Sequence, residues 1–508
     1  MGTQISHTKL LRLAIAYIAV VTISNSIYAA SSTTGSKKGP NILYIFTDDQ
    51  SRRSVSAYEE AHDWVDTPNI DALAESGMRF RTCYTGASCQ MSRAMMMTGR
   101  LQHAIQSFDT SRYPACDYDP KIQSFWPANF RRNGYQTACI GKWHLGEDVG
   151  HGRDWDYSVI WDREGPKKNG GAYYHGTLVR YNGSERVPLG GYSTDRYTEL
   201  AVDYIENKSK DAGKPWFLWL CYGGVHGPYT EADRHQTLYD DAPPTDVPAD
   251  IFGPRLTKPE HLKNYSKWKK DAQGNPKGLD KAVKKYNRAV AALDEGVGKV
   301  VEALRKSGQL ENTLIVYTSD QGFAWGQHGS REKWMGYDAN IAAPLIFSYS
   351  GKIKPSQVCN EPVTGLDIVQ TFHKVARINP VIELHGRDMS PILSNPAKQL
   401  EDPLLFTHTA RLYGDKFLNV IKCGGFVGQA EKPAYLMMRE ERYKYIRHMK
   451  KNTIEELYDL DKDPRELTNL AVNPEYAQLL KRLREKAVVE IRKKAGEFID
   501  HLPEPKGQ

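Results

Sequence analysis

Short, mostly apolar runs alternate with helical stretches along most of the chain. The runs have the length and composition of strands buried on both faces, and they occupy residues 41–46, 136–140, 216–220 and 313–317. Helical stretches at 198–209 and 279–307 precede two of these runs, and the second stretch carries apolar residues at helical spacing. This alternation predicts an α/β fold in which helices flank a large, mostly parallel central sheet.

The pattern changes from about residue 396 onwards. Residues 417–421 and 443–446 have the pattern of antiparallel strands, and residues 476–494 have that of a basic amphipathic helix. We therefore expect a smaller C-terminal α+β subdomain with an antiparallel sheet. Residues 231–278 are rich in proline, aspartate and lysine, which is typical of a long surface excursion.

The N-terminus has the three parts of a secretory signal peptide. Lys9 and Arg12 give it a positive start, residues 13–23 are mostly apolar, and Ala29 and Ala30 offer a cleavage site. The apolar run is too short to span a bilayer comfortably, and no later segment is apolar for long enough. The sequence therefore predicts a protein exported to the periplasm or secreted, with no stable membrane span.

These features divide the chain of 508 residues into four parts. A chain of this length has room for one large domain and a smaller one. The predicted parts are a signal peptide, a polar linker, a catalytic domain and the C-terminal subdomain, at residues 1–30, 31–39, 40–395 and 396–508.

Composition and charge exclude some classes of protein. Hydrophobic residues make up 40% and charged residues 25% of the chain, as in globular proteins. The formal net charge of +7 falls to +5 once Lys9 and Arg12 are removed with the signal peptide, and the other basic residues are spread along the chain. A nucleic-acid-binding protein would carry a dense basic stripe, so we expect no nucleic-acid partner. The seven cysteines form no C-x-x-C pair, which argues against a zinc site.

Polar residues follow each of the four predicted strands, at positions 47–50, 141–146, 223–228 and 319–322. The carboxyl ends of parallel strands lie at one edge of a sheet, where open α/β folds bind ligands. Asp48, Asp49 and Asp320 would meet there and would need a cation to offset their repulsion. Oxygen ligands, to which the Gln321 amide would add one, favour calcium or magnesium over zinc. The alternative for Asp48–Asp49 is a turn or a helix cap.

Cys89 lies near the N-terminus of a predicted helix that continues through residues 94–98. An anion is stabilised at such a place, so Cys89 is a candidate nucleophile. The alternative is a buried structural cysteine. The run of methionines after it is typical of a packed core.

Several motifs resemble those of the type I, formylglycine-dependent sulfatases of the alkaline phosphatase superfamily. Residues 89–93 (CQMSR) and 98–100 (TGR) are similar to the signature C-x-P-S-R with its following T-G-R, and residues 141–146 (GKWHLG) match the second signature in full. Further motifs fall in the family's order, namely Asp48–Asp49, 320–322 (DQG), 327–329 (QHG), Lys333, 385–388 (HGRD) and 456–460 (ELYDL). The resemblance covers roughly residues 40–475 and implies an alkaline-phosphatase-like sandwich.

The resemblance implies a sulfatase that hydrolyses sulfate esters. Its nucleophile would be formylglycine, formed from Cys89 by a formylglycine-generating or equivalent maturing enzyme. A hydrated aldehyde carries two hydroxyls, of which one would attack sulfur and the other would later expel sulfate. The implied metal is Ca2+, in preference to Mg2+, held by residue 89 together with Asp48, Asp49, Asp320 and Gln321.

The resemblance also implies roles for cationic side chains and histidines. Arg93 would orient residue 89, while Lys142 and Lys333 would bind and clamp the sulfate oxygens where charge develops. His226 would bind substrate and protonate the leaving alcohol, and His144 would take the proton from the sulfated residue, although the two could exchange these roles.

His328 is a further candidate for substrate binding. We expect a sulfated glycan as the substrate, because a secreted protein with positive net charge and the aromatic segment 173–175 suit an anionic sugar. The alternative for that segment is ordinary packing.

Two positions depart from the family pattern. Met91 stands in place of the usual proline or alanine of the modification motif, and Gln321 in place of the usual asparagine. Two other functions stay open. One is a phosphonate or phosphodiester hydrolase of the same superfamily, and the other is a non-catalytic glycan-binding protein, which would follow if Met91 prevented the conversion of Cys89.

Overall fold

The computed structural model describes residues 39–506, apart from residues 112–115, 164–168 and 210–212. The predicted signal peptide and nearly all of the predicted linker lie outside the described residues. Within the described residues, no helix is both long enough and apolar enough to cross a membrane.

The strand β1 (Asn41–Thr47) lies in the middle of the large sheet, which has eleven strands in the described part of the chain. Its direct neighbours are β7 (Trp216–Cys221) and β8 (Thr313–Ser319), and next to β7 come β3 (Gln136–Lys142) and β4 (Tyr157–Trp161). All of these strands run parallel. The four predicted strands and the mostly parallel sheet are therefore confirmed.

Antiparallel pairs extend this sheet on both sides. On one side β11 is antiparallel to β8 and β2, and on the other β5 is antiparallel to β4 and β6. The strands outside the parallel centre are β2 (Met78–Tyr84), β5 (Leu178–Tyr181), β6 (Arg186–Pro188), β11 (Ala342–Ser348), β12 (Gln357–Cys359) and β13 (Val363–Thr364).

The sheet has a hydrophobic core on each face. All seven residues of β1 are buried, and because side chains alternate along a strand, Tyr44 and Phe46 enter one core while Leu43 and Ile45 enter the other. Strands buried on both faces read as continuous apolar runs, which is the pattern seen in the sequence.

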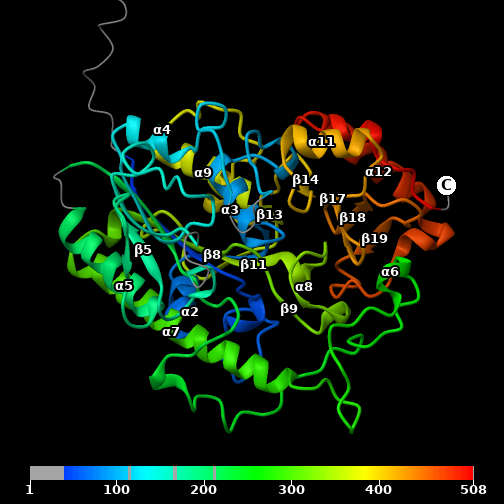
Figure 1. Cartoon of the computed structure of the whole chain (residues 1–508), viewed down its shortest axis with the longest axis horizontal. Coiled ribbons are helices and arrows are strands. Elements are labelled where there is room, and N and C mark those ends of the chain that lie inside the picture. Colours follow the sequence, from blue (N-terminus) through cyan, green and yellow to red (C-terminus); the bar gives the residue numbers. More distant parts are fainter. Residues whose placement is uncertain (1–38, 112–115, 164–168, 210–212, 507–508) are drawn as a thin grey trace, which may run out of the picture. The chain divides into compact units, whose positions relative to one another are not determined.

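Helices cover both faces of the sheet (Figure 1). The core on the Leu43 side includes residues of α2 (Pro68–Glu75), α5 (Ser193–Asp203) and α7 (Leu279–Lys306). The core on the Tyr44 side includes residues of α3 (Cys89–Thr98), α4 (Pro127–Arg132) and α9 (Gly365–Ala376). Of the two predicted helices, 279–307 matches α7, while 198–209 spans the end of α5 and a π-helical turn at Tyr204–Lys208.

A smaller antiparallel sheet follows in the C-terminal part of the chain, as predicted. Its order is β14 (Leu404–His408), β17 (Tyr435–Glu440), β18 (Tyr443–His448) and β19 (Glu456–Asp459). The predicted basic helix is α12 (Ala477–Arg492). Because one hydrophobic core joins this sheet to the Tyr44 side of the large sheet, the described residues from Pro40 onwards form one compact unit, and a domain boundary at residue 396 stays a prediction.

The strand predicted at 417–421 is wrong, because these residues belong to the helix α11 (Gly414–Lys422). Its fully buried side chains are Phe417 and Ile421, which lie four residues apart and so one helical turn apart. A short apolar run fits both the two-residue repeat of a strand and the 3.6-residue repeat of a helix, and the structure adopts the helix here. The second predicted strand, 443–446, is confirmed as part of β18.

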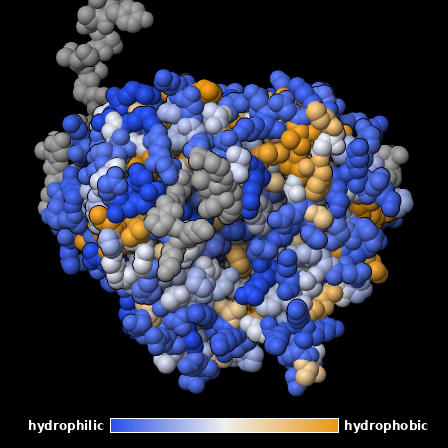
Figure 2. Space-filling model, in the orientation of Figure 1, coloured by the Kyte–Doolittle hydropathy of each residue, from blue (hydrophilic) through white to orange (hydrophobic). Residues whose placement is uncertain are grey.

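Residues 231–278 form the expected surface excursion. They contain only a 3-10 turn at Asp233–His235 and the short helix α6 (Glu260–Lys263), and most of their side chains are exposed or half-buried. Lys258 is an exception, since only 1% of it is exposed. The face of the molecule in Figure 2 is mostly hydrophilic, with several apolar patches, of which a clear one lies at the upper right.

Candidate active site

The carboxyl ends of β1 and β8 bring the three predicted acidic residues together. Because these strands are parallel and paired to their last residues, Asp48–Asp49 and Asp320 leave the sheet side by side. The Asp49 amide donates a hydrogen bond to Asp320 Oδ1 at 3.0 Å. One oxygen from each carboxylate and the Cys89 sulfur all lie within 4.8 Å of one another. We call Asp48, Asp49, Asp320 and Cys89 the acid cluster.

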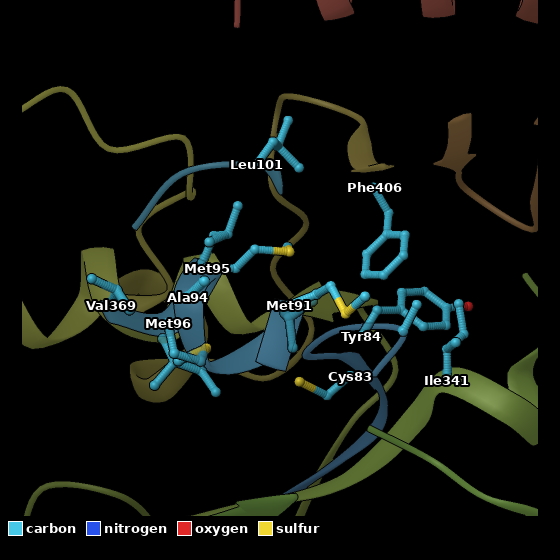
Figure 3. Close-up of a cluster of buried hydrophobic side chains, with 14 of the residues drawn as sticks. Cys83, Tyr84, Met91, Ala94, Met95, Met96, Leu101, Ile341, Val369 and Phe406 are labelled. Atoms are coloured by element: carbon cyan, nitrogen blue, oxygen red, sulfur yellow. The ribbon is translucent and has the colours of Figure 1, made fainter. Parts of the chain in front are cut away.

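Cys89 is the first residue of α3, a helix whose ten residues are all buried. Figure 3 shows the helix in a hydrophobic cluster, with Met91, Met95 and Met96 among apolar side chains that include Val369 from α9. The methionine run is therefore core, as predicted. Met91, the departure from the modification motif, packs in this cluster and is 2% exposed.

The Cys89 thiol is not poised to act as a thiolate. Burial raises its pKa to about 12, and the neighbouring Asp48 carboxylate contributes in the same direction. A thiol with this pKa stays protonated at neutral pH, so the cysteine needs chemical modification, or a strong local cation, to become a nucleophile.

Two buried lysines pair with the acid cluster. Lys142, the last residue of β3, donates from Nζ to Asp48 Oδ2. Lys333 Nζ donates to Asp49 Oδ1 at 2.5 Å and to Cys89 Sγ at 2.8 Å. Burial opposes the charge on Lys333, but the Asp49 carboxylate holds its pKa well above the usual value. Each ammonium group therefore lies against a carboxylate of the acid cluster.

Arg93 fastens α3 to the strand ends. It lies one helical turn after Cys89, is fully buried, and donates from Nη1 to the Lys142 carbonyl at 2.6 Å and from Nη2 to Asp320 Oδ2 at 3.1 Å. Burial opposes its ionisation, but Asp320 holds the pKa of the guanidinium above its usual value. The structure thus places Arg93 so that it fixes Lys142 and Asp320 relative to residue 89.

His226 is held at the edge of the acid cluster by two tyrosines. Its Nε2 lies 3.6 Å from Asp49 Oδ2, its ring stacks on Tyr173 with centres 4.0 Å apart, and its carbonyl accepts a hydrogen bond from Tyr174 at 2.7 Å. Burial lowers the pKa of His226 to about 4. Both tyrosines are buried, so the segment 173–175 supports His226 and exposes only His175.

His144 is oriented by an arginine that no motif predicted. Arg163 Nη1 lies 2.9 Å from His144 Nε2, and Arg163 Nη2 donates to the Gly170 carbonyl at 2.9 Å. Burial lowers the pKa of His144 well below its usual value, and the Arg163 charge adds to this effect. His144 is therefore neutral at working pH.

A cavity of about 200 Å³ gives access to the site. Its lining includes four predicted residues, Cys89, His144, His226 and Lys333. It also includes Arg163, Glu332 and Trp334. The last two flank Lys333 in the sequence and could have been found by extending that motif, whereas nothing in the sequence pattern singles out Arg163.

His328 does not join the acid cluster. Its ring packs against Tyr337 with centres 4.1 Å apart, and its backbone amide donates to Asp250 Oδ2 at 3.0 Å. The side chain is 2% exposed, and burial lowers its pKa to about 4. The structure thus favours a packing role for His328 over substrate binding.

The donor set of the acid cluster suits a hard divalent cation. Asp48 Oδ1 is buried and has no hydrogen-bond partner among the described residues, and an ion would satisfy it. Burial and the Asp48 charge raise the pKa of Asp320 to about 7, so the carboxylates are not fully offset by the neighbouring cations. Gln321 donates from its amide nitrogen to Asp49 and turns its oxygen toward Ser92, so its amide would have to rotate to ligate an ion.

A model of the sulfatase family matches residues 40–378, which is more than half of the chain. The chain belongs to the sulfatase family. It is therefore a sulfuric ester hydrolase of the alkaline phosphatase superfamily. A second model, of the C-terminal part of N-sulphoglucosamine sulphohydrolase, matches residues 425–494 of this sulfatase.

The sulfatase is similar along most of its length to other hydrolases and to solved structures. It is 27% identical over 510 aligned positions to the N-acetylglucosamine-6-O-sulfatase of Bacteroides thetaiotaomicron, covering 88% of this chain and 85% of the relative. A solved structure of a protein in complex with its substrate D-glucosamine-2-N,6-O-disulfate matches with a TM-score of 0.73 and 23% identity, over 89% and 99% of the two chains. The phosphonate monoester hydrolase of Agrobacterium radiobacter matches with a TM-score of 0.67 and 20% identity, over 90% and 96%. The similarity to these two structures supports the α/β fold described above.

Proposed function

We propose that this sulfatase removes sulfate from a sulfated carbohydrate, with a formylglycine nucleophile made from Cys89 and with Ca2+ held by the acid cluster. The observation that carries the proposal is the convergence of Asp48, Asp49, Asp320 and Cys89 within 4.8 Å. The carbohydrate substrate is supported by the similarity to an N-acetylglucosamine-6-O-sulfatase over 88% of the chain.

Lys142 and Lys333 would bind the sulfate oxygens. Their ammonium groups come from different elements, one from the end of β3 and one from the segment after β10 (Arg331–Glu332), and each already faces a carboxylate of the acid cluster. As negative charge builds on the sulfate oxygens, both cations stabilise it without having to reorient. Arg93 would fix the positions of residue 89 and Lys142 relative to each other.

The two histidines would handle protons at the cavity. His226 has an Nε2 that faces Asp49 and the cavity. Its ring is neutral at working pH, so it would first take up a proton, which the Asp49 carboxylate favours, and then give that proton to the oxygen of the leaving alcohol. His144 is neutral and lines the same cavity, and its contact with Arg163 fixes the direction of its ring. A neutral imidazole can accept a proton, so His144 would take the proton from the sulfated residue 89.

Two groups would complete the site. Formylglycine at position 89, when hydrated, would supply a hydroxyl nucleophile in place of a thiol that burial keeps protonated. Ca2+, held by the acid cluster and by Gln321 after rotation of its amide, would offset the charge of three buried carboxylates and of the sulfate. The oxygen donors favour Ca2+ or Mg2+ over softer metals.

We further propose that the protein is exported to the periplasm or secreted after removal of residues 1–30. The proposed organisation is a linker at 31–39, a catalytic domain at 40–395 and a C-terminal subdomain at 396–508. A formylglycine-generating or equivalent enzyme would be its maturation partner.

Mass spectrometry of the tryptic peptide Thr82–Arg93 tests the nucleophile. The sample is active enzyme produced together with a maturing enzyme, and we expect an aldehyde in place of the thiol at position 89. An active sample with unmodified thiol throughout would contradict the proposed nucleophile. Because a phosphonate monoester hydrolase has the same fold, kcat/KM is also compared on matched sulfate, phosphate and phosphonate esters. A preference for the phosphorus esters would favour that alternative function.

A further inference from the structure

The segment that carries Lys333 is held by contacts on both sides of the lysine. Lys333 lies between β10 and the short helix α8 (Asp338–Ile341). Next to it, the Trp334 amide donates to the Ala87 carbonyl at 3.1 Å, which ties the segment to the residues before Cys89. Before the lysine, β10 pairs with β9 (Ala324–Trp325), and the Glu332 carbonyl accepts a hydrogen bond from Asn340 at 2.7 Å. After Trp334, the first residue with a buried side-chain hydrogen bond is Tyr337.

Tyr337 is tied to the C-terminal sheet through a buried carboxylate. Its hydroxyl donates to Glu456 Oε2 at 2.7 Å, and Glu456 belongs to β19. The same oxygen accepts a hydrogen bond from the Tyr458 hydroxyl, and the other oxygen lies 2.6 Å from His448 Nε2. Lys258, from the surface excursion, donates to the Tyr458 hydroxyl at 2.6 Å and lies 3.7 Å from Glu456.

We call Tyr337, Glu456, Tyr458, Lys258 and His448 the buried cluster. The side chains of Lys258 and Glu456 are 0% exposed, and the ammonium lies 3.9 Å from the Tyr337 ring centre and 4.2 Å from that of Tyr458. Removing two charges from water this completely costs as much as their attraction returns, so such a pair adds little net stability. The pair does restrict the arrangement of the side chains around it, because every buried polar atom of the network needs a hydrogen-bond partner in a particular position.

A second set of contacts fixes the next residue. The Asp338 amide donates to Glu466 Oε2 at 2.6 Å. Lys444 of β18 donates to Asp338 Oδ1 at 2.8 Å and lies 2.7 Å from Glu466 Oε1. The side-chain partner of Tyr337 and those of Asp338 therefore come from residues 444–466, which include the 456–460 motif that the catalytic chemistry does not use.

We propose that the buried cluster positions Lys333, so that the C-terminal sheet sets the geometry of sulfate binding. Glu456 is then a positioning residue that acts through Tyr337. The inference rests on the proposed role of Lys333 as a sulfate clamp. The alternative is that the cluster only joins the C-terminal sheet to the rest of the fold.

The adjacent residue Glu455 provides a matched control. It is also buried, at 4% exposure, and its carboxylate accepts hydrogen bonds from Arg484 Nε at 2.9 and 3.1 Å and from the Tyr445 hydroxyl. These partners belong to α12 and β18 and none belongs to the Lys333 segment. Glu455→Gln therefore disturbs the C-terminal sheet without touching Tyr337.

The experiment is a double-mutant cycle on the mature full-length enzyme. Glu456→Gln and Glu455→Gln are each made in the wild-type and Lys333→Met backgrounds, and kcat/KM is measured below the unfolding temperature of every variant. We expect Glu456→Gln to lower kcat/KM by about 10- to 100-fold when Lys333 is present, since small misplacements of a catalytic group have effects of this size. In the Lys333→Met background the same change should cost at most about twofold, because the group that it positions is already gone. Glu455→Gln should leave kcat/KM unchanged in both.

Each result decides for or against the inference. Equal losses from Glu456→Gln in both backgrounds, or equal losses from Glu456→Gln and Glu455→Gln, would show a general structural role and overturn it. If Glu456→Gln does not fold, Tyr337→Phe, which removes a single hydroxyl, is put through the same cycle. Normal activity of Lys333→Met would refute the clamp and the inference with it, whereas an impaired Lys333→Met beside a fully active Glu456→Gln would refute the inference alone.

Discussion

Replacing Lys333 by methionine tests the electrostatic part of the site. The change removes the ammonium that lies 2.5 Å from Asp49 Oδ1 and 2.8 Å from Cys89 Sγ, and it keeps an unbranched chain of similar length. By analogy with the loss of one donor to a developing oxyanion, we expect the barrier to rise by about 2–4 kcal/mol. That corresponds to a fall in kcat/KM of about 30- to 1,000-fold.

The structure also bounds the effect on folding. Asp49 keeps a hydrogen bond from the Gln321 amide and lies 3.6 Å from His226 Nε2, so its carboxylate is not left without partners. We therefore expect the variant to fold, with a loss of stability of about 1–3 kcal/mol, which is the usual cost of one missing partner to a buried polar group. Thermal unfolding followed by circular dichroism measures this.

The assay compares kcat/KM for desulfation of a sulfated oligosaccharide by the wild type, by Lys333→Met and by Lys352→Met, which removes an exposed lysine away from the cavity. Each sample is first checked for equal conversion of position 89. A Lys333→Met enzyme that folds, is fully converted and works within about threefold of wild type would refute the clamp, because the expected loss is at least tenfold greater than that.

Three other outcomes are expected. Cys89→Ala should abolish turnover while leaving the unfolding temperature near that of the wild type, and residual turnover above background would show a different nucleophile. Chelation with EGTA should remove activity and lower the unfolding temperature, since an ion that binds only the folded state stabilises it by about 2.7 kcal/mol at a hundredfold excess over its Kd; recovery with Mg2+ but not Ca2+ would contradict the preferred metal. His226→Ala should slow the hydrolysis of sugar sulfates far more than that of aryl sulfates, because a sugar alcohol is a poor leaving group without a proton and an aryl leaving group needs none. Equal losses on both substrates would argue against proton donation by His226.

The central sheet and the acid cluster could be predicted from the sequence because each depends on local patterns. The four apolar runs are strands buried on both faces, and Asp48 and Asp320 follow two of them directly. Parallel pairing then places those side chains at one edge whatever the details of the loops.

The remainder depends on contacts between distant segments. Arg163 reaches His144 from a loop with no motif, and its role is visible only once the two segments are folded together. His328 lies within a motif, yet its ring turns to Tyr337 and away from the acid cluster, because the direction of a side chain in an irregular loop is set by tertiary packing. The apolar run 417–421 fits both a strand and a helix, and only the burial of Phe417 and Ile421 decides between them.

The burial of α3 has a consequence for how the enzyme is made. Cys89 is 3% exposed and stands at the head of a helix with no exposed residue, packed between the large sheet and α9. Another protein cannot bind the segment around Cys89 unless α3 first leaves its packed position in the core. The proposed conversion of Cys89 must therefore take place on the nascent or unfolded polypeptide, and a molecule that folds before it is modified is trapped as an inactive thiol form.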